Sequence, residues 1–243
     1  MAATASDEPC MSKRAKLQHT DTERAKLQHT DTENAERLVE ELYTSRDLSI
    51  DAAFSISEAD IKHVNTLSGS AKAVNYGEVL LSSWATVLLH VGLGPDDVFL
   101  DLGSGRGLLV LYTQLSCGVR RSIGVELSRE RHAIATRALA LLRTRDPRAA
   151  AATEFRNEDM RATDLSEATC VFLMNADLPH KLVAAVWERL LQRERPCVVL
   201  TLYAPRDVEA SRLPPRETLS RIPQSWNSNT DVLVYRLPGS ASS

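Results

Sequence analysis

The sequence predicts an α/β fold in which a mostly parallel sheet is covered by helices on both faces. Three observations lead to this prediction. Short apolar runs alternate with amphipathic helical stretches from residue 79 onwards. A glycine-rich turn follows the first of these runs, in the segment VFLDLGSGRG that begins at Val98, and a second run ends in the acid Glu126. The order of strand, glycine loop, helix, strand and acid is typical of one half of a nucleotide-binding sheet.

The composition limits the class of protein. A chain of 243 residues can form one α/β domain with a modest extension. A net charge of -3 provides no overall attraction to nucleic acid. No apolar run approaches the roughly 20 residues needed to span a bilayer, and the N-terminal residues lack the apolar core of a secretory signal. The four cysteines lack pair spacing, so neither a disulfide framework nor a metal site is expected, and a reducing compartment fits.

The first 33 residues differ from the rest of the chain. The polar decapeptide RAKLQHTDTE occurs twice in succession, at 14–23 and 24–33, which is typical of a duplication in a tail. We expect residues 1–33 to be a disordered or partly helical tail, because few large apolar side chains are available for burial. Its basic cluster, Lys13-Arg14-Ala15-Lys16, resembles a short nuclear-import signal, the alternative being a solvated run of charge.

The remaining chain divides into a small N-terminal helical lobe with a loop at 34–78, a main domain at 79–237 and a short tail at 238–243. In the lobe, Leu38, Leu42 and Tyr43 fall on one face of a short amphipathic helix, whereas Gly77 argues against a helix through the whole of 55–78. In the main domain we expect helices over 79–91, 128–143 and 179–193. A loop is expected at 146–153 and a linker poor in helix at 205–230. Strands are expected at 98–100, 122–125, 153–157, 170–174, 197–202 and 231–237.

Polar side chains follow four of the predicted strands. Asp101, Glu126, Asp159 and Asn175 each stand just past an apolar run. Because the carboxyl ends of parallel strands meet at one edge of a sheet, we expect the four groups to surround one ligand. For Asp159 or Asn175 taken alone, an ordinary polar cap between strand and loop would be the simpler interpretation.

The glycine loop indicates the chemistry of that ligand. Its spacing is D-x-G-x-G-x-G, and Asp101 stands where it would repel a pyrophosphate, so a ligand with an amine or a cation is favoured. Glu126 offers two acceptor oxygens for both hydroxyls of a ribose. S-adenosylmethionine has an ammonium, a sulfonium and a ribose, and the loop resembles motif I of Rossmann-like class I methyltransferases. A generic glycine-rich turn is the alternative.

That resemblance implies a seven-stranded class I sheet and S-adenosyl-L-methionine as the cofactor. Glu126 would hold the ribose, Asp159 would accept a hydrogen bond from the adenine amino group, and Asn175 would lie nearest the transferred methyl. No metal is expected. The loop at the amino-acid end of the cofactor would comprise Asp101, Gly103, Ser104, Gly105 and Gly107.

Further motifs narrow the class. The tetrapeptide Asn75-Tyr76-Gly77-Glu78 lies about 20 residues before VFLDLGSGRG, and GVE and VFLMN follow it. Together they resemble the disruptor-of-telomeric-silencing family of non-SET histone H3 lysine methyltransferases, and in particular its compact protist members. The Ser225-Trp226 pair followed by a strand with Tyr235 is similar to the end of that family's domain, so the resemblance covers roughly residues 74–237.

The chain departs from the family pattern in three places. The paired asparagines of the family are reduced to Met174-Asn175. Ala176 stands where the family usually has an aromatic residue. The spacing from Trp226 to Tyr235 is two residues longer than expected.

The resemblance implies an enzyme that methylates a lysine on the globular core of histone H3 within the nucleosome, in the nucleus. Tyr76 and Glu78 would belong to a loop that closes over the methionine part of the cofactor. Asn175, Tyr76 and Tyr235 would be the catalytic residues. A monomer without membrane contact is expected, with weak contacts to nucleosomal DNA from the tail cluster or from a basic face formed by Arg212, Arg216 and Arg221.

Two alternatives remain open at this point. The chain could be a Rossmann-like methyltransferase for a non-histone protein lysine or a small molecule, although Tyr76-Gly77-Glu78 argues against it. It could also be a binding module that recognises chromatin without catalysis, although the intact acids and glycine loop argue against that.

Overall fold

The computed structural model describes residues 32–214 and 216–239 and confirms the predicted α/β class. Its sheet has seven strands in the order β3-β2-β1-β4-β5-β7-β6. The first five are parallel, and β7 runs antiparallel to both β5 and β6. The strands are β1 Val98–Leu102, β2 Arg121–Val125, β3 Thr153–Arg156, β4 Cys170–Leu173, β5 Cys197–Thr201, β6 Arg216–Leu219 and β7 Val232–Leu237.

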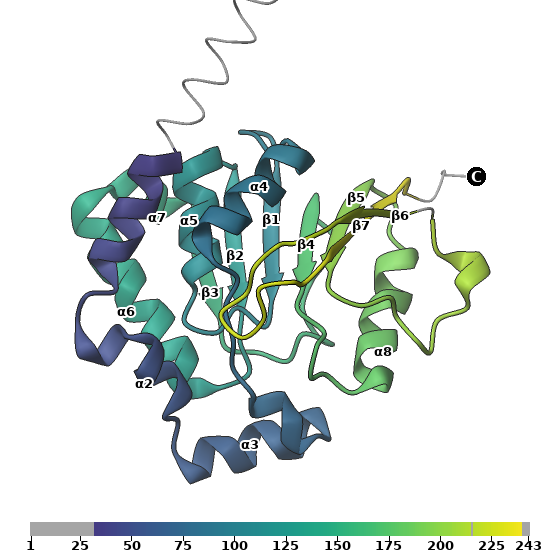
Figure 1. Cartoon of the computed structure of the whole chain (residues 1–243), viewed down its shortest axis with the longest axis horizontal. Helices are drawn as coiled ribbons and strands as arrows, with labels where there is room; N and C mark the ends of the chain where they lie inside the picture. The colour runs from purple at the N-terminus through teal and green to yellow at the C-terminus, as the bar shows by residue number, and fades with distance from the viewer. Residues whose placement is uncertain (1–31, 215, 240–243) are drawn as a thin grey trace, which may run out of the picture.

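Helices cover both faces of this sheet, as Figure 1 shows. A helix over 32–42 comes first. It is followed by η1 Arg46–Leu48, α2 Ile50–Phe54, α3 Glu58–Ser68, η2 Ala71–Val74, α4 Leu81–Val91, α5 Leu108–Cys117, α6 Arg129–Arg145, α7 Pro147–Ala151, α8 His180–Leu191 and η3 Ala210–Arg212. None of the helices in the described ranges is both long and apolar enough to cross a bilayer. The predicted import signal lies outside the described residues, and so does the decapeptide repeat except for its last two residues, Thr32 and Glu33, which begin the first helix.

Two apolar clusters hold the layers together. On one face, α4, α5 and α6 pack against the sheet, and Trp84 of α4 is fully buried against Phe99 and Phe172. On the other face, α8 packs with Trp187 fully buried against Tyr235. Each helix buries the apolar stripe that its sequence pattern predicts, and burial of such large side chains is the main stabilising term of the fold.

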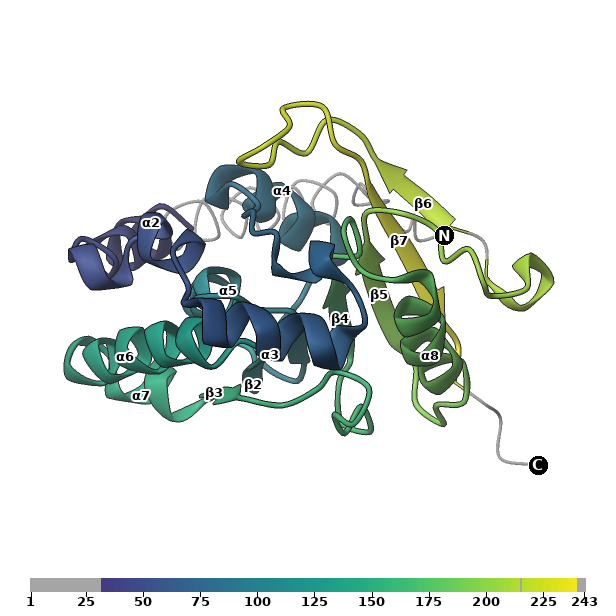
Figure 2. The same cartoon turned by 90° about the horizontal axis from the view of Figure 1, so that it is seen from below.

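The N-terminal helices bring α3 to the edge where the parallel strands end. Figure 1 shows α3 beyond the strand ends, and Figure 2 shows it lying across them. Asp60 of α3 fixes this position, because its buried carboxylate accepts hydrogen bonds from the Ser128 hydroxyl and from the Arg129 and Glu130 amides at the start of α6. A carboxylate at a helix N-terminus satisfies amides that have no partner within the helix. The helix α3 therefore forms one wall of whatever lies at the strand ends.

Several local predictions are confirmed with shifted ends. In the first helix, Leu42 and Tyr43 are buried and Leu38 is half-buried. Ser128 caps α6 as expected, its hydroxyl accepting from the Arg131 amide. The predicted helix over 79–91 begins only at Leu81, because Val79 forms a bridge with Gln224 instead.

Two local predictions are wrong. The expected loop at 146–153 contains α7, whose start is stabilised by the Asp146 side chain and by Pro147 in the first turn. The expected linker at 205–230 contains the edge strand β6, whose residues RETL are mostly exposed. A four-residue polar strand has no apolar alternation, so only its pairing with β7 defines it.

Candidate functional site

A cavity of about 550 Å³ lies at the carboxyl ends of the strands. The loop from Asn75 to Gly77 and helix α3 form one side of it, and the ends of β1, β2 and β4 form the other. Four of the predicted site residues line it: Tyr76, Gly103, Glu126 and Asp159. The side chains that complete its walls include Phe54, Val64, Arg131, Glu158, Met160, Met174, Asp177, Leu182 and Trp226.

Glu126 lies at the floor of this cavity with its carboxylate fixed at both oxygens. Oε2 accepts the Gly105 amide at 2.8 Å and Oε1 accepts the Ser128 amide at 2.7 Å. Burial raises the pKa of Glu126, while nearby Arg131 and the two amides oppose that rise. Each carboxylate oxygen has a second lone pair, so both can still accept a hydroxyl from a ligand.

The glycine loop runs beneath Tyr76. Gly103, Gly105 and Gly107 all have positive φ, between 56° and 96°, which residues with a side chain adopt only at a cost. At Gly105 a side chain is excluded twice, because a β-carbon there would also lie 2.5 Å from the Tyr76 ring. The loop glycines therefore allow the backbone to turn and Tyr76 to lie directly on it.

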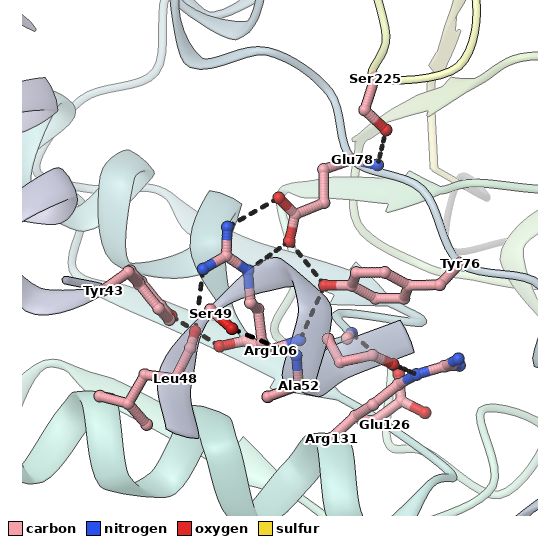
Figure 3. Close-up of polar contacts among 12 residues, drawn as sticks. Tyr43, Leu48, Ser49, Ala52, Tyr76, Glu78, Arg106, Glu126, Arg131 and Ser225 are labelled. Carbon is pink, nitrogen blue, oxygen red and sulfur yellow. Dashed lines mark hydrogen bonds and ion pairs between the residues drawn. The ribbon is translucent and has the colours of Figure 1, made fainter. Parts of the chain in front are cut away.

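Arg106 holds the Tyr76 loop in place, a role that no sequence pattern predicted (Figure 3). Its guanidinium donates to both oxygens of Glu78, at 2.6 and 2.8 Å, and to the Leu48 carbonyl at 3.0 Å. Tyr76 donates its hydroxyl to Glu78 at 2.6 Å. Burial raises the pKa of Tyr76, so it stays protonated as this hydrogen bond requires. Arg106 also stacks on the Tyr43 ring, 4.4 Å from its centroid.

A second contact holds the same loop from outside. The Ser225 hydroxyl accepts the Glu78 amide at 3.0 Å, and the Ser225 amide donates to the Glu78 carbonyl at 2.7 Å. The neighbouring Trp226 ring packs so closely on Gly77 that a β-carbon there would lie 2.1 Å from it. The Ser225-Trp226 pair that the sequence singled out is thus joined directly to the Tyr76–Glu78 loop.

Glu78 itself does not line the cavity. Its carboxylate is committed to Arg106 and Tyr76, and its side chain is about 11% exposed. The expectation that Glu78 contacts the cofactor therefore needs correction, since in this structure the residue supports Tyr76 from behind. The buried Arg106 and Glu78 neutralise each other, so neither charge is left unpaired, which is the condition for a stable internal ion pair.

Asp101 is buried within β1, one residue before the strand ends, and not past its end as the sequence suggested. It is 3% exposed, and burial together with the nearby Glu126 raises its pKa from 3.8 to about 8. A carboxyl group in that state exchanges its proton readily for a nearby cation. Asp101 and Ser104 lie beneath the cavity wall and do not themselves line it.

The raised pKa of Asp101 has a measurable effect on stability. Between about pH 4 and pH 8 the folded state holds a proton that the unfolded state has released, so stability falls as the pH rises through this window. Asp101→Asn removes the ionisation. We expect this variant to exceed the wild type in unfolding free energy by about 2 to 4 kcal/mol at pH 8 and by little near pH 4. Thermal unfolding of both proteins across this range measures the difference, and a gap that does not change with pH contradicts the assignment.

Asp159 lines the cavity but is already engaged. Although burial opposes it, hydrogen bonds from Arg161 hold the pKa of Asp159 below its usual value. Arg161 also donates to the Leu67 carbonyl at 2.7 Å, which ties the loop after β3 to helix α3. One oxygen of the Asp159 carboxylate would have to be shared with any ligand amine.

Asn175 and Tyr235, two of the three expected catalytic residues, lie elsewhere. The Asn175 amide is bound to the Tyr203 backbone, donating to its carbonyl at 2.7 Å and accepting its amide at 3.0 Å. Tyr235 is 1% exposed and packs on Trp187 beneath the sheet. The structure does not bring Tyr235, expected as a catalytic residue, to the cavity, because it pairs with Val199, two positions before β5 ends, and faces α8.

Sequence reasoning missed Arg131 and the contact that Asn75 makes across the cavity. Arg131 donates to the Ala53 and Val74 carbonyls and lies 4.7 Å from the Tyr76 ring centroid. Asn75 bridges the cavity mouth by donating to Asp177 at 3.0 Å. The spacing of residues carries no signal for these contacts, since each joins segments at least 50 residues apart.

Comparison with known proteins agrees with the observed fold. A proposed RNA methyltransferase from Pyrococcus horikoshii has a similar structure, with a TM-score of 0.50 and 12% identity; the match covers 77% of this chain and all of that one. It supports the class I methyltransferase fold.

Two sequence relatives carry the name histone-lysine N-methyltransferase, H3 lysine-79 specific. The one from Caenorhabditis elegans is 42% identical over 53 residues, which are 22% of this chain and 6% of the relative. The one from Cryptococcus neoformans is 45% identical over 58 residues, which are 24% and 9%. The matches thus span only a small part of these relatives. A family model described as histone methylation protein DOT1 matches residues 56–211, well over half of the chain, and the chain belongs to this family.

Proposed function

We propose that the protein transfers a methyl group from S-adenosyl-L-methionine to a lysine of histone H3 in the nucleosome. The observation that carries the proposal is the cavity at the strand ends, whose acidic groups match a cofactor with two positive charges and a ribose. Family membership and the names of the relatives support histone H3 as the substrate, and lysine 79 as the residue to test first.

The donor set of the cavity fits the cofactor. Glu126 has two oxygens with free lone pairs at the end of β2, where they would bind the ribose hydroxyls. Gly103 lines the cavity without a side chain, so a ligand can lie against the loop backbone. Asp159, on the β3 side, would take the adenine amino group. In the sheet order β3-β2-β1-β4, the cofactor would then extend toward β4 with its amino-acid end over Asp101.

Asp101 would act by exchanging its proton for the cofactor ammonium. Its pKa of about 8 keeps it largely neutral at pH 7, so little unpaired charge is buried before binding. An ammonium brought within a few ångströms favours the ionised carboxylate and forms a buried pair. The group therefore favours a cationic ligand over a neutral one.

The methyl would be transferred near Met174 and Trp226. These side chains and Asp177 form the part of the cavity beyond the end of β4. The cofactor supplies a sulfonium methyl, which is already activated for attack by a nucleophile. The chain's own residues need only do three things: orient the lysine in line with the methyl group, keep water out, and bind the lysine amine in its neutral state. Tyr76, held by Glu78 and Arg106, lines the same cavity.

In this proposal Asn175 is a positioning residue. Its amide is saturated by the Tyr203 backbone, so it fixes the loop after β5 and does not itself contact the lysine. Tyr76 is the residue of the predicted catalytic set that remains at the cavity.

The nuclear location and the mode of nucleosome binding belong to the same proposal. The predicted import signal lies outside the described residues. Of the three arginines expected to contact DNA, Arg212 is bound by Glu188 through two hydrogen bonds of 2.7 Å, whereas Arg216 and Arg221 are exposed. A weak basic contact and a monomeric state remain predictions for binding and sedimentation experiments.

A methyl-transfer assay tests the proposal. Radiolabelled S-adenosyl-L-methionine is supplied with nucleosomes, free histones and an unrelated lysine-rich protein. We expect label on H3 in nucleosomes, and mass spectrometry identifies the residue. Label on other proteins but never on nucleosomes contradicts the histone substrate, and cofactor binding without any transfer supports a non-catalytic module.

A further inference from the structure

A second hollow, of about 320 Å³, adjoins the main cavity. The two share Ala176, which lines both. The remaining walls of the second hollow come from the end of β4, the start of α8 and the loop after β5, and they comprise Asn175, His180, Val183, Tyr203, Ala204, Pro205 and Arg206. The hollow therefore lies beside the part of the cavity assigned to methyl transfer.

The walls of this hollow are fixed. The two hydrogen bonds between Asn175 and the Tyr203 backbone join the segment after β4 to the loop after β5. Val183 and Pro205 are buried behind it. The small side chain of Ala176 keeps the space between the two hollows open, because a larger side chain at this shared position would fill it.

The charge of the second hollow is opposite to that of the cavity. Arg206 Nη1 lies 3.3 Å from His180 Nε2. Within the described parts of the chain, no carboxylate forms an ion pair with Arg206, in contrast to Arg212, which Glu188 neutralises. The main cavity instead has the carboxylates Glu126, Glu158, Asp159 and Asp177 on its walls. A guanidinium with free donors is well suited to a carboxylate.

We propose that the second hollow binds an acidic side chain, Asp or Glu, that flanks the target lysine in the substrate protein. The inference rests on the proposed function, because it takes the lysine to enter beside Ala176. A residue that flanks the lysine in the same chain would reach a recess that adjoins the transfer site. The hollow has room for a carboxylate side chain, and one arginine in a recess does not make the extended contact that a DNA backbone needs.

Binding and transfer measurements test this with four peptide sets. Each peptide has one central lysine whose neighbours are Asp and Glu, Asn and Gln, Lys, or phosphoserine. Fluorescence polarisation with S-adenosylhomocysteine present gives affinity, and methyl transfer gives kcat/KM. We expect the wild type to prefer the Asp and Glu set over the Asn and Gln set about tenfold. Arg206→Glu is expected to remove this preference and to favour the lysine-flanked set.

The matched control is Arg143→Glu. Arg143 is exposed in the last turn of α6 and lines neither hollow, so the same change of charge there should leave the preference intact. Ala176→Phe provides a second test, since a large side chain at this position should lower the preference. Thermal unfolding identifies variants that fail to fold.

The outcomes separate the two proposals. An acidic preference in peptide binding, together with no methyl transfer to nucleosomes, contradicts the proposed function and leaves the subsite standing. Methyl transfer with equal preference for acidic and neutral peptides overturns the subsite alone, as does a preference that Arg206→Glu leaves unchanged. A preference for phosphoserine over Asp and Glu assigns the hollow to phosphate and overturns the carboxylate, and so does displacement of all peptides by a short DNA duplex.

Discussion

Replacement of Glu126 by alanine is expected to weaken the binding of S-adenosylhomocysteine about 100-fold. The carboxylate would supply two charge-assisted hydrogen bonds to the ribose, each worth about 1.5 to 3 kcal/mol, and the removal of both exceeds the 1.4 kcal/mol of a tenfold change. The substitution also leaves the Gly105 and Ser128 amides without their acceptor, so the glycine loop loses a fixed point. Isothermal titration calorimetry measures the affinity.

The same substitution at Glu188 serves as the control for Glu126. Glu188 is exposed on α8 and pairs with Arg212 away from the cavity. Glu188→Ala should leave the affinity within about twofold of the wild type, because an exposed ion pair contributes little. An unchanged affinity in Glu126→Ala, in protein that melts as a folded domain, would refute the ribose assignment.

Replacement of Arg106 by methionine is expected to destabilise the protein by about 3 to 5 kcal/mol. Glu78 would be left as a buried carboxylate without its cation, and the Leu48 carbonyl would lose its donor. For a domain of this size the loss corresponds to a fall in melting temperature of about 10 °C. Methyl transfer should fall further than the loss of stability explains. Without Arg106, the Glu78 carboxylate is no longer held in the position from which it accepts the Tyr76 hydroxyl and orients it. Differential scanning calorimetry and the transfer assay measure the two effects.

A double substitution distinguishes the ion pair from simple loss of packing. Glu78→Gln combined with Arg106→Met removes both charges, so the double variant should be more stable than Arg106→Met alone. The single variant Arg236→Met provides the matched control, since Arg236 pairs with Glu217 on the surface and should cost under about 1 kcal/mol. If Arg106→Met proved as mild as Arg236→Met, the buried pair would not be what holds the Tyr76 loop.

Much of the fold follows from local patterns in the sequence. The strand β1 and the turn after it could be predicted because the apolar run leads into a glycine-rich loop, whose glycines have positive φ values that few other residues adopt. The helix α8 was predictable from its apolar stripe, which packs as expected through Trp187. Features with a weak local signal were missed, such as the polar edge strand β6 and the short helix α7.

The sequence by itself determined which groups would stand at the strand ends, and the structure brings Tyr76, Gly103, Glu126 and Asp159 to one cavity. The glycine conformations and the alternation of strand and helix are local properties, so they could be predicted from the sequence. Only the tertiary structure decided which of those groups are free. Glu78 is committed to Arg106, Asn175 to the Tyr203 backbone and Tyr235 to the core beneath the sheet. The physical reason is that a polar group's availability depends on partners distant in the chain, and these meet it only when the layers pack.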